Sequence, residues 1–406
     1  MQPRSTTGTL RDGDTYDVIV VGARVAGAAT AMLLARAGLR VVVLDHAAPG
    51  SDALSTHALM RAGVLQLSRW GLLKDIVAAG TPPVRRTTFQ YGGERIVISI
   101  KPTVGVDALY APRRTLLDPL IVRAAEEAGA AVHHRTSVIG LIRRDGRVIG
   151  VRATTVDGSM IELRAPLVVG ADGIRSSVAS LTGAAVVRSG TSTSATTYGY
   201  FHGLETDGYE WNFEPDACSG VIPTNDGAAC VFVGATPARI GRGGVGLIHE
   251  IIAESAPELS ERLARATPPA GARTWAGQPG FVRRAWGPGW ALVGDAGYFK
   301  DPLSAHGLTD ALRDAELVAR AVTSGFGRQA VLDTALAEYE SLRDRLSLPL
   351  FDVVERIAAQ QWSTAEIGSL LMELSSAMTD EVEFLSGLDT GPEQGLDTRF
   401  SSVAVR

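Results

Sequence analysis

Three short segments of the sequence place glycine and aspartate directly after apolar runs that read as buried strands. They are Gly22–Gly27, with the letters GARVAG, then Asp172-Gly173, and then Gly294-Asp295. Glycine allows a tight turn that exposes backbone N–H groups, and such groups suit phosphate oxygens. An aspartate at the end of a strand can accept hydrogen bonds from ribose or ribityl hydroxyls. The pattern predicts a nucleotide-type cofactor at one edge of a parallel sheet.

The first segment carries the most specific pattern. It follows the apolar run 17–21 and opens an alanine-rich helix, and Asp45 closes the next apolar run. Such a turn directs a diphosphate to the positive end of the helix, and Asp45 is placed to accept a ribose hydroxyl. Arg24 replaces the second glycine of the usual G-x-G-x-x-G. Its side chain hinders the closest approach of the phosphates but can pair with one, because a guanidinium matches phosphate oxygens.

A later segment, Gly241–Gly246, matches the G-x-G-x-x-G pattern letter for letter. It follows a polar loop and Pro237, its helix is cut short by Pro257, and no acidic residue ends a return strand. We therefore expect a flexible loop there and no nucleotide site.

The third segment continues into a turn that carries the candidates for acid–base chemistry. Pro302 and Gly307 set the start of the next helix so that its positive end faces an electron-rich ring edge. His306 is the first candidate for catalysis and Lys300 the second. Structural roles are the alternatives, since a histidine at a helix start often caps or packs, and Lys300 could form an ion pair with its neighbour Asp301.

These segments predict an α/β fold in which all three lie at one edge of a sheet. Apolar runs predict buried parallel strands, and an alternating pattern predicts an antiparallel sheet in a strand-rich insert. The predicted class is α/β: a Rossmann-like domain for the nucleotide-type cofactor, with an antiparallel β-sheet substrate domain and C-terminal helices. Strands are expected at 17–21, 40–44, 87–100, 167–169 and 291–293, and helices at 26–37, 57–79, 116–128 and 308–322, with further helices to about 388.

The same reading divides the chain into parts. Residues 1–14 and 391–406 are expected to be flexible tails. The predicted parts between them are the Rossmann-like cofactor-binding domain over 15–190, whose segment 84–110 joins the substrate sheet, the substrate domain over 191–280, a return segment of the cofactor-binding domain over 281–330, and the C-terminal helices over 331–390.

The strand-rich insert supplies the candidate substrate-binding residues. Tyr198, Tyr200, Trp211 and Phe213 would give the pocket an apolar wall for stacking, and His202 could orient a polar group. The alternative is that at least half of these aromatic side chains form the core of the sheet. His57 is a weaker candidate for a base, because it follows Ser55 and Thr56 and fits a helix start.

Taken together, the motifs resemble the FAD-dependent monooxygenases related to para-hydroxybenzoate hydroxylase. The resemblance covers residues 16–345. Two further segments agree with it, the stretch from Met60 to Leu65 and the stretch from Arg114 to Asp118. In the second stretch the register leaves Arg113 as the alternative arginine. The resemblance implies that FAD is held by Gly22, Arg24, Ala26, Gly27, Asp45, Arg61, Arg114, Asp172, Gly173, Gly294, Asp295, Pro302, Gly307 and Leu308.

The resemblance also implies a reaction. NADPH or NADH reduces the flavin, molecular oxygen forms a flavin C4a-hydroperoxide, and one oxygen atom is transferred to a small aromatic or polycyclic substrate by hydroxylation or epoxidation. The cofactor carries out this chemistry, while the protein supplies position and excludes water. The family's Asp-Gly segment usually ends in arginine where this chain has Ala179, so the nicotinamide contact departs from the family.

Three other functions remain as alternatives. Alkene reductases of the geranylgeranyl type share the turn after Gly294-Asp295. Flavin-dependent halogenases share the architecture but carry a W-x-W-x-I-P segment, and its nearest match, Cys218–Pro223, lacks both tryptophans. A flavin-binding redox sensor without turnover is supported only by Ala179 and Arg24.

Composition narrows the partners. The net charge of −5 argues against nucleic acid or an anionic membrane surface, and no apolar run approaches the length of a membrane helix. Two cysteines form neither a disulfide framework nor a metal site, so we expect a reducing, cytoplasmic setting without bound metal. A homodimer is left open, and the resemblance suggests a place in secondary metabolism.

Overall fold

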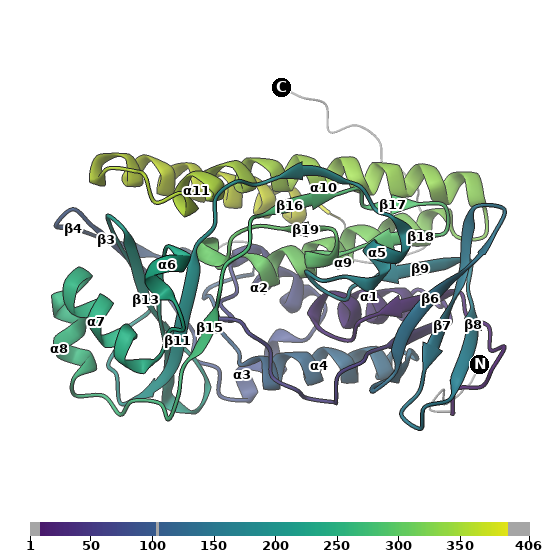
Figure 1. The fold of residues 1–406 in the computed structure, drawn as a ribbon, viewed down its shortest axis with the longest axis horizontal. Coiled ribbons are helices and arrows are strands. Elements are labelled where there is room, and N and C mark those ends of the chain that lie inside the picture. The colour runs from purple at the N-terminus through teal and green to yellow at the C-terminus, as the bar shows by residue number, and fades with distance from the viewer. Residues whose placement is uncertain (1–8, 103–104, 389–406) are drawn as a thin grey trace.

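The computed structural model describes residues 9–102 and 105–388, and its first unit is a mostly parallel sheet of six strands. Across the sheet the order is β17-β18-β9-β1-β2-β5, in which β1, β2, β5, β9 and β18 run parallel. Figure 1 labels β9, β17 and β18 of this sheet. The strands span Val18–Val21 (β1), Val41–Leu44 (β2), Ala131–His133 (β5), Leu167–Gly170 (β9), Trp286–Gly287 (β17) and Trp290–Leu292 (β18).

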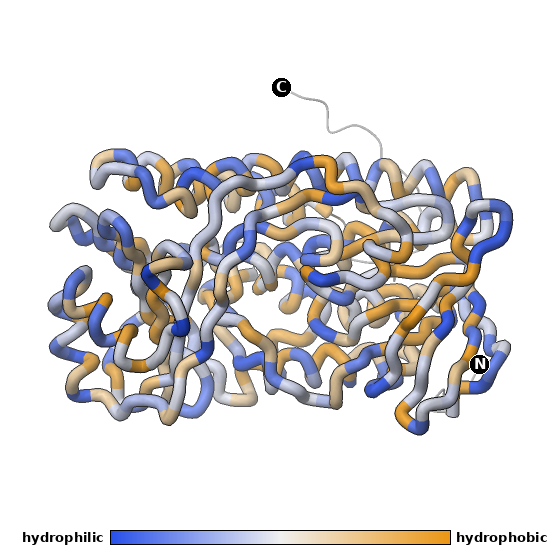
Figure 2. Tube along the Cα trace, in the orientation of Figure 1, coloured by the Kyte–Doolittle hydropathy of each residue, from blue (hydrophilic) through white to orange (hydrophobic). Residues whose placement is uncertain are grey.

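Both faces of this sheet are covered, which explains why its central strands are apolar throughout. Val18 and Val20 of β1 face helices α1 (Val25–Arg36), α4 (Arg114–Glu127) and α9 (Gly307–Gly325). Ile19 and Val21 face a three-stranded sheet on the other side. Its strands are β6 (Ser137–Arg144), β7 (Arg147–Thr154) and β8 (Met160–Arg164). The hydrophobic segments gather inside this layered unit (Figure 2).

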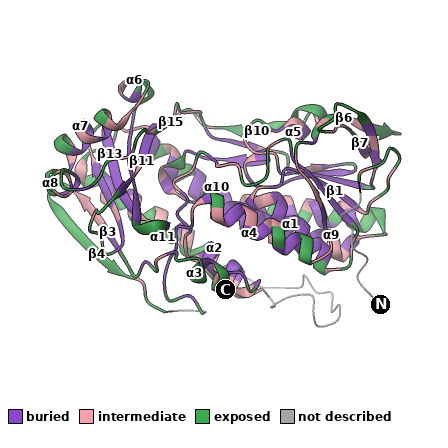
Figure 3. Ribbon diagram, turned by 90° about the horizontal axis from the view of Figure 1, so that it is seen from below, coloured by how far each residue is buried: buried purple, intermediate pink, exposed green. Residues whose placement is uncertain are grey.

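The second unit is a seven-stranded sheet in the order β15-β11-β14-β13-β12-β3-β4. Its pairs are antiparallel except β12 with β3, which run parallel because β3 comes from a distant part of the chain. The segment 84–110 thus joins this sheet, and its strand β4 forms an exposed edge (Figure 3). The strands are β3 (Arg86–Tyr91), β4 (Glu94–Ser99), β11 (Ala195–His202), β12 (Tyr209–Glu214), β13 (Ala217–Pro223), β14 (Ala228–Ala235) and β15 (Arg273–Trp275).

The C-terminal helices α10 (Gln329–Ala358) and α11 (Thr364–Ser386) run along one long side of the molecule and bridge the two sheets (Figure 1). Trp362, between them, packs against Phe213 of β12. No helix in the described ranges is both long and apolar enough to cross a membrane. The remaining elements are α2 (Arg61–Arg69), α3 (Leu73–Ala78), α5 (Ser177–Thr182), α6 (Pro237–Ile240), α7 (Val245–Ser255), α8 (Pro257–Leu263), β10 (Val186–Ser189), β16 (Phe281–Arg283) and β19 (Tyr298–Phe299).

The structure corrects the expected elements in two places. The helical stretch 57–79 is two short helices, because Gly71 adopts a positive φ of 79° that ends the first. Residues 11–14, expected in a flexible tail, lie along β8, where the N–H of Gly13 donates to the carbonyl of Glu162 at 2.8 Å. The predicted tail 391–406 lies outside the described residues.

Residues Gly241–Gly244 connect α6 to α7, as the sequence predicted for a loop, while Val245 and Gly246 begin α7. Gly244 is the N-cap of α7, and α8 begins at Pro257, directly after it. Both helices pack on the outer face of the seven-stranded sheet. The carboxyl edge of the parallel strands belongs to the other sheet. This location gives the segment no part in the predicted cofactor site.

Candidate functional site

The three glycine- and aspartate-containing segments converge in the structure. They follow β1, β9 and β18, which are neighbours in the parallel sheet and end at the same edge. A Cβ atom added at Gly22 would lie 2.4 Å from the carbonyl oxygen of Ala171, and one at Gly294 would lie 3.1 Å from the Cβ of Ala26. The first segment therefore contacts both of the others, and larger side chains would separate them.

The turn Gly22–Gly27 has the geometry of an anion site. Gly22 adopts a φ of 106°, and a Cβ at Gly27 would lie 1.9 Å from the carbonyl oxygen of Gly22. Arg24 is the N-cap of α1 but provides no side-chain cap, so the first N–H groups of the helix remain available to a ligand. Within the described part of the chain, the guanidinium of Arg24 has no hydrogen-bond or ion-pair partner.

Asp45 is buried at the end of β2 and is held by the turn itself. Its Oδ2 accepts a hydrogen bond from the N–H of Ala23 at 2.6 Å, and its Oδ1 accepts one from Ala47 at 2.6 Å. A carboxylate has about four acceptor positions, so two remain for ligand hydroxyls. The structure therefore fixes this side chain at the place where the sequence predicted ribose recognition.

Asp172 has a structural task that the sequence did not reveal. Its carboxylate accepts hydrogen bonds from Ser176 Oγ at 2.5 Å and from the N–H of Ser177 at 2.6 Å, and so caps helix α5. Gly173 adopts a φ of 77°, and a Cβ there would meet no atom within 4 Å. Gly173, not Asp172, faces open space. Ala179 is buried, 4% exposed, which leaves no room for the family's arginine in this packing.

Asp295 follows Gly294, whose N–H donates to Asp314 Oδ2 at 3.0 Å. Burial raises the pKa of Asp295 to about 6, and the charges of Asp310 and Asp314 act in the same direction. Lys300 opposes this shift. A carboxyl with a pKa in this range is poorly solvated, and it gains from a hydroxyl that donates to it. This environment fits the role predicted for Asp295.

The turn after β19 forms a one-turn helix, Pro302–Ser304, which Asp301 caps by accepting from the N–H of Leu303 at 3.1 Å. Helix α9 then begins at Gly307 without a side-chain cap. Pro302 and Gly307 are exposed, while Leu308 is buried. A Cβ at Gly307 would meet nothing within 4 Å, so the positive end of α9 faces open space.

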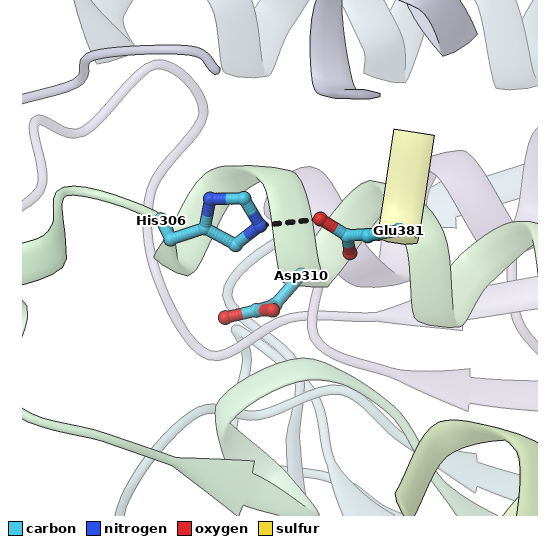
Figure 4. Close-up of side chains that lie close together, drawn as sticks. All are labelled: His306, Asp310 and Glu381. Carbon is cyan, nitrogen blue, oxygen red and sulfur yellow. Dashed lines mark hydrogen bonds and ion pairs between the residues drawn. The ribbon is translucent and has the colours of Figure 1, made fainter. Parts of the chain in front are cut away.

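His306 and Lys300, the two candidates for catalysis, both belong to a buried charge cluster. Figure 4 shows three of its members, His306, Asp310 and Glu381. Lys300 pairs with Asp310 on α9, which corrects the expected pair with Asp301, because Asp301 is occupied by the backbone and hydroxyl of Ser194. His306 Nε2 lies 2.5 Å from a carboxylate oxygen of Glu381 on α11. The members of the buried charge cluster are Lys300, His306, Asp310, Arg313, Asp314 and Glu381.

The two arginines considered near the start of α4 point in different directions. Arg114 is buried and forms a bidentate pair with Asp118 at 2.7 and 2.9 Å, and its charge lowers the pKa of Asp295. Arg113 instead lies over the ring of Tyr200, with its guanidinium carbon 3.6 Å from the ring centre. The structure thus favours Arg114 as the arginine beside the predicted FAD site.

Arg61 was predicted to bind FAD, but its side chain binds backbone carbonyl groups. Its Nη1 donates to the carbonyl oxygens of Lys101 at 3.0 Å and Val106 at 3.4 Å. These bonds tie α2 to the loop after β4. A contact with the diphosphate therefore stays a prediction for this side chain.

The aromatic residues predicted to bind substrate divide into two groups. Tyr198, Trp211 and Phe213 are buried on the face of the seven-stranded sheet that packs against α10 and α11, so part of this wall is sheet core. His202 is exposed at the end of β11 and lies outside this buried aromatic cluster. An enclosed cavity of about 20 Å³ lies on this face, lined by Thr56, Thr196, Trp211, Phe232, Pro302, Leu303 and Ala305.

Sequence reasoning underrated His57, which is not at a helix start. It is 2% exposed, and its Nε2 lies 3.2 Å from the hydroxyl of Tyr200, with the two rings stacked. Burial lowers the pKa of His57 to about 3, and the charge of Arg113 adds to this effect. Arg313, Asp314 and Glu381 were missed as well. The run Asp310–Asp314 on an otherwise apolar helix is the signal that could have revealed the first two.

The residues at the sheet edge fit FAD. Two uncapped helix ends, α1 and α9, suit a diphosphate and an electron-rich ring edge, and two acidic residues, Asp45 and Asp295, suit hydroxyl groups. Open space at Gly173 and Gly307 leaves room for ligand atoms between the segments.

Comparisons with solved structures agree with this fold. The structure of PqsL from Pseudomonas aeruginosa in complex with 2-aminobenzoylacetate superposes with a TM-score of 0.77 at 22% identity, covering 88% of this chain and all of that one, 100%. The flavin-dependent brominase Bmp2 has a TM-score of 0.76 at 18% identity, covering 94% and 95%. At these identities the likeness establishes the architecture only.

Comparisons of sequence identify the family. Digeranylgeranylglycerophospholipid reductase of Methanocella arvoryzae is 26% identical over 347 residues, covering 80% of this chain and 82% of that protein. Digeranylgeranylglycerophospholipid reductase 2 of Methanopyrus kandleri is 28% identical over 313 residues, covering 73% and 74%. A family model described as "FAD binding domain" matches residues 15–347. The chain therefore belongs to the FAD-binding domain family, and it is an FAD-dependent oxidoreductase.

Proposed function

We propose that the protein is an NAD(P)H-driven monooxygenase that hydroxylates or epoxidises a small aromatic or polycyclic substrate. The observation that carries the proposal is the position of a small, mostly apolar hollow between the Pro302–Ala305 turn and the aromatic face of the seven-stranded sheet, which at about 20 Å³ has room for about one water molecule and must widen to admit a substrate. A substrate held there would lie between aromatic side chains and the part of the protein assigned to the flavin ring. This arrangement suits the transfer of oxygen to a planar molecule that is shielded from water.

FAD, when bound, supplies the redox chemistry, and the side chains around the cavity have simpler tasks. Trp211 and Phe232 enclose an apolar substrate and exclude water, because both line the cavity. Thr56 lines it too and precedes His57 in the chain, while His57 and Tyr200 themselves lie behind the lining residues. The pair can orient a substrate hydroxyl.

The hydrogen bonds of His57 define how this pair works. Nδ1 lies 3.1 Å from the carbonyl oxygen of Ala111, which can only accept, so Nδ1 carries the hydrogen. With the pKa of His57 lowered to about 3, the ring is neutral near pH 7 and Nε2 accepts from the Tyr200 hydroxyl. The lone pairs of Tyr200 then remain to accept a hydrogen bond from a substrate hydroxyl, while the lowered pKa of His57 keeps its ring from taking up the proton.

A second function, the reduction of an alkene, is favoured by the relatives. Two of them are named digeranylgeranylglycerophospholipid reductases, and both align over about three quarters of their length or more. We infer that the His57–Tyr200 pair, which can bind a hydroxyl group, suits a hydroxylated substrate better than a prenyl chain.

The two functions differ in what happens to oxygen. The purified holoprotein would be reduced anaerobically with NADPH or NADH and then mixed with oxygenated buffer in a stopped-flow spectrophotometer. A transient absorbing species before the return of oxidised flavin, together with ¹⁸O₂ incorporation into a phenolic product, supports the monooxygenase. Direct reoxidation without label, and anaerobic reduction of a polyprenyl alkene, would replace it with the reductase.

A further inference from the structure

Helix α11 lies beyond the stretch that matches the FAD-binding family, residues 15–347, yet it reaches the predicted cofactor site. Its residue Glu381 is 2% exposed. One carboxylate oxygen lies 2.5 Å from His306 Nε2, and the other lies 2.9 Å from Arg313 Nη1. Figure 4 shows Glu381 projecting from α11 toward the first turns of α9, where His306 and Asp310 lie. The helix is thus joined to the start of α9 by buried, charged contacts.

From Glu381 the buried charge cluster continues to the FAD site along two paths. Arg313 donates to Asp314 at 2.8 Å, and Asp314 accepts from the N–H of Gly294 at 3.0 Å. Arg313 also donates to Asp310 at 2.9 Å. Asp310 pairs with Lys300, whose charge acts on Asp295. Both paths end at Gly294-Asp295.

The charges of this cluster are nearly balanced. Burial alone would raise the pKa of Glu381, but the charges of His306 and Arg313 outweigh it and hold that pKa below its usual value. Burial likewise opposes the ionisation of Asp310, and Lys300 and Arg313 outweigh it. Each carboxylate therefore depends on a specific cation, and removal of one charge leaves another uncompensated.

A metal ion is the other occupant that this geometry suggests. Ligand atoms of His306, Asp310 and Glu381 lie within 4.8 Å of one another. However, Asp310 and Glu381 already hold Lys300 and Arg313, and these two cations would repel a third. In Figure 4 the ring nitrogen of His306 that does not face Glu381 points away from both carboxylates. The cluster is a network of ion pairs rather than a cation site.

We propose that Glu381 is a positioning residue, which joins α11 to the FAD site and sets the charge balance beside the bound flavin. Through His306 it holds the start of α9 and the preceding turn, and through Arg313 it supports the Gly294-Asp295 turn. The inference rests on FAD as the cofactor, not on the monooxygenase reaction. A change in the charge of Glu381 should therefore change the midpoint potential of the bound flavin even without substrate.

The test is the midpoint potential of bound FAD, measured on holoprotein by dye equilibration without substrate or oxygen. Glu381→Gln removes a buried negative charge, which favours the electron-rich reduced flavin. We expect reduced FAD to bind about tenfold more tightly relative to oxidised FAD, a rise of about 30 mV for a two-electron couple. Lys300→Gln removes a positive charge and should lower the potential by a similar amount.

Glu383→Gln is the matched control, since Glu383 is exposed on the same helix. Its potential should equal that of the unmodified protein. If Glu381 has a purely structural role, the Tm of the cluster variants should fall while their midpoint potentials stay unchanged, or both potentials should shift in the same direction. Either result would overturn the proposal. If Glu381→Gln does not fold, Glu381→Asp replaces it, because the shorter side chain withdraws the carboxylate from His306 and Arg313. Its potential should then differ from that of the unmodified protein, and an equal potential would overturn the proposal. A failure of the monooxygenase test has no bearing on these measurements.

Discussion

The Nε2 atom of His57 lies 3.2 Å from the hydroxyl oxygen of Tyr200, although 143 residues separate the two in the chain. His57 belongs to the segment that precedes α2, and Tyr200 belongs to β11 of the seven-stranded sheet. The contact therefore crosses the boundary between the two units of the fold. It places a neutral imidazole against a phenol whose pKa is raised by burial.

This buried histidine should make stability depend on pH. The pKa of His57 is about 3 in the folded protein and 6.5 ordinarily, so the unfolded chain binds the extra proton between these values. The free energy of unfolding should then fall as the pH drops below 6.5, by up to about 1.4 kcal/mol per pH unit from this residue. Urea unfolding at pH 7 and pH 5 measures the change.

His57→Asn is the informative variant, because asparagine tolerates the positive φ of 52° found at this position. We expect its stability to vary less between pH 7 and pH 5 than that of the unmodified protein. His202→Asn, at an exposed position, should retain the original pH dependence. An unchanged dependence in His57→Asn would show that His57 is not the group responsible.

Asp295 should oppose stability while it supports cofactor binding. Its folded pKa of about 6 exceeds the ordinary value of 3.8, so stability is lost as the pH rises through 6 and the buried carboxyl ionises. At pH 8, Asp295→Asn should stabilise the apoprotein by about 1–3 kcal/mol, since the amide carries no charge. The same variant should lose FAD during purification, and Asp295→Ala should lose it as well.

Thermal unfolding of the apoprotein and the ratio of flavin to protein absorbance provide the two measurements. Asp207→Asn, an exposed member of an ion pair, is the control and should change neither by much. Full retention of FAD by Asp295→Ala would remove this residue from the cofactor site.

Local patterns made the parallel sheet predictable. Buried strands such as Val18–Val21 are apolar throughout because both faces are covered, and Gly22 must be glycine because its φ is 106° and Ala171 lies against it. These constraints act within a few residues or between adjacent strands. The order of motifs along the chain was therefore enough to predict that the three segments meet at one edge of the sheet.

The substrate side was less predictable for a physical reason. A buried charge is stabilised by whichever opposite charge the tertiary fold brings near, and Glu381 meets His306 across 75 residues of sequence. Lys300 illustrates the error: its neighbour in sequence is Asp301, but Asp301 turns to Ser194 and Lys300 to Asp310. Sequence spacing alone does not choose between such partners.

Arg24 should strengthen FAD binding at the turn where the family usually has glycine. Its guanidinium has no partner in the described residues and lies at the uncapped start of α1, so a diphosphate is the acceptor that fits. Arg24→Ala should weaken FAD by roughly 1.5–3 kcal/mol, the range for a hydrogen bond to a charged group. Titration of apoprotein with FAD measures the loss, and Arg95→Ala, on the exposed edge strand β4, serves as the control. Unchanged or tighter binding would mean that the side chain points away from the cofactor.

Trp211 should limit the size of the substrate, because it lines an enclosed cavity of only about 20 Å³. Trp211→Phe shortens the side chain and enlarges the cavity, at a cost in stability below the roughly 3–5 kcal/mol of full truncation to alanine. Flavin reduction and oxygen uptake would be compared for phenols of one, two and three fused rings, and the preference should move toward the larger ones. Phe213→Leu alters the same sheet face without lining the cavity and should keep the original preference. If Trp211→Phe keeps it too, the substrate binds elsewhere on the sheet.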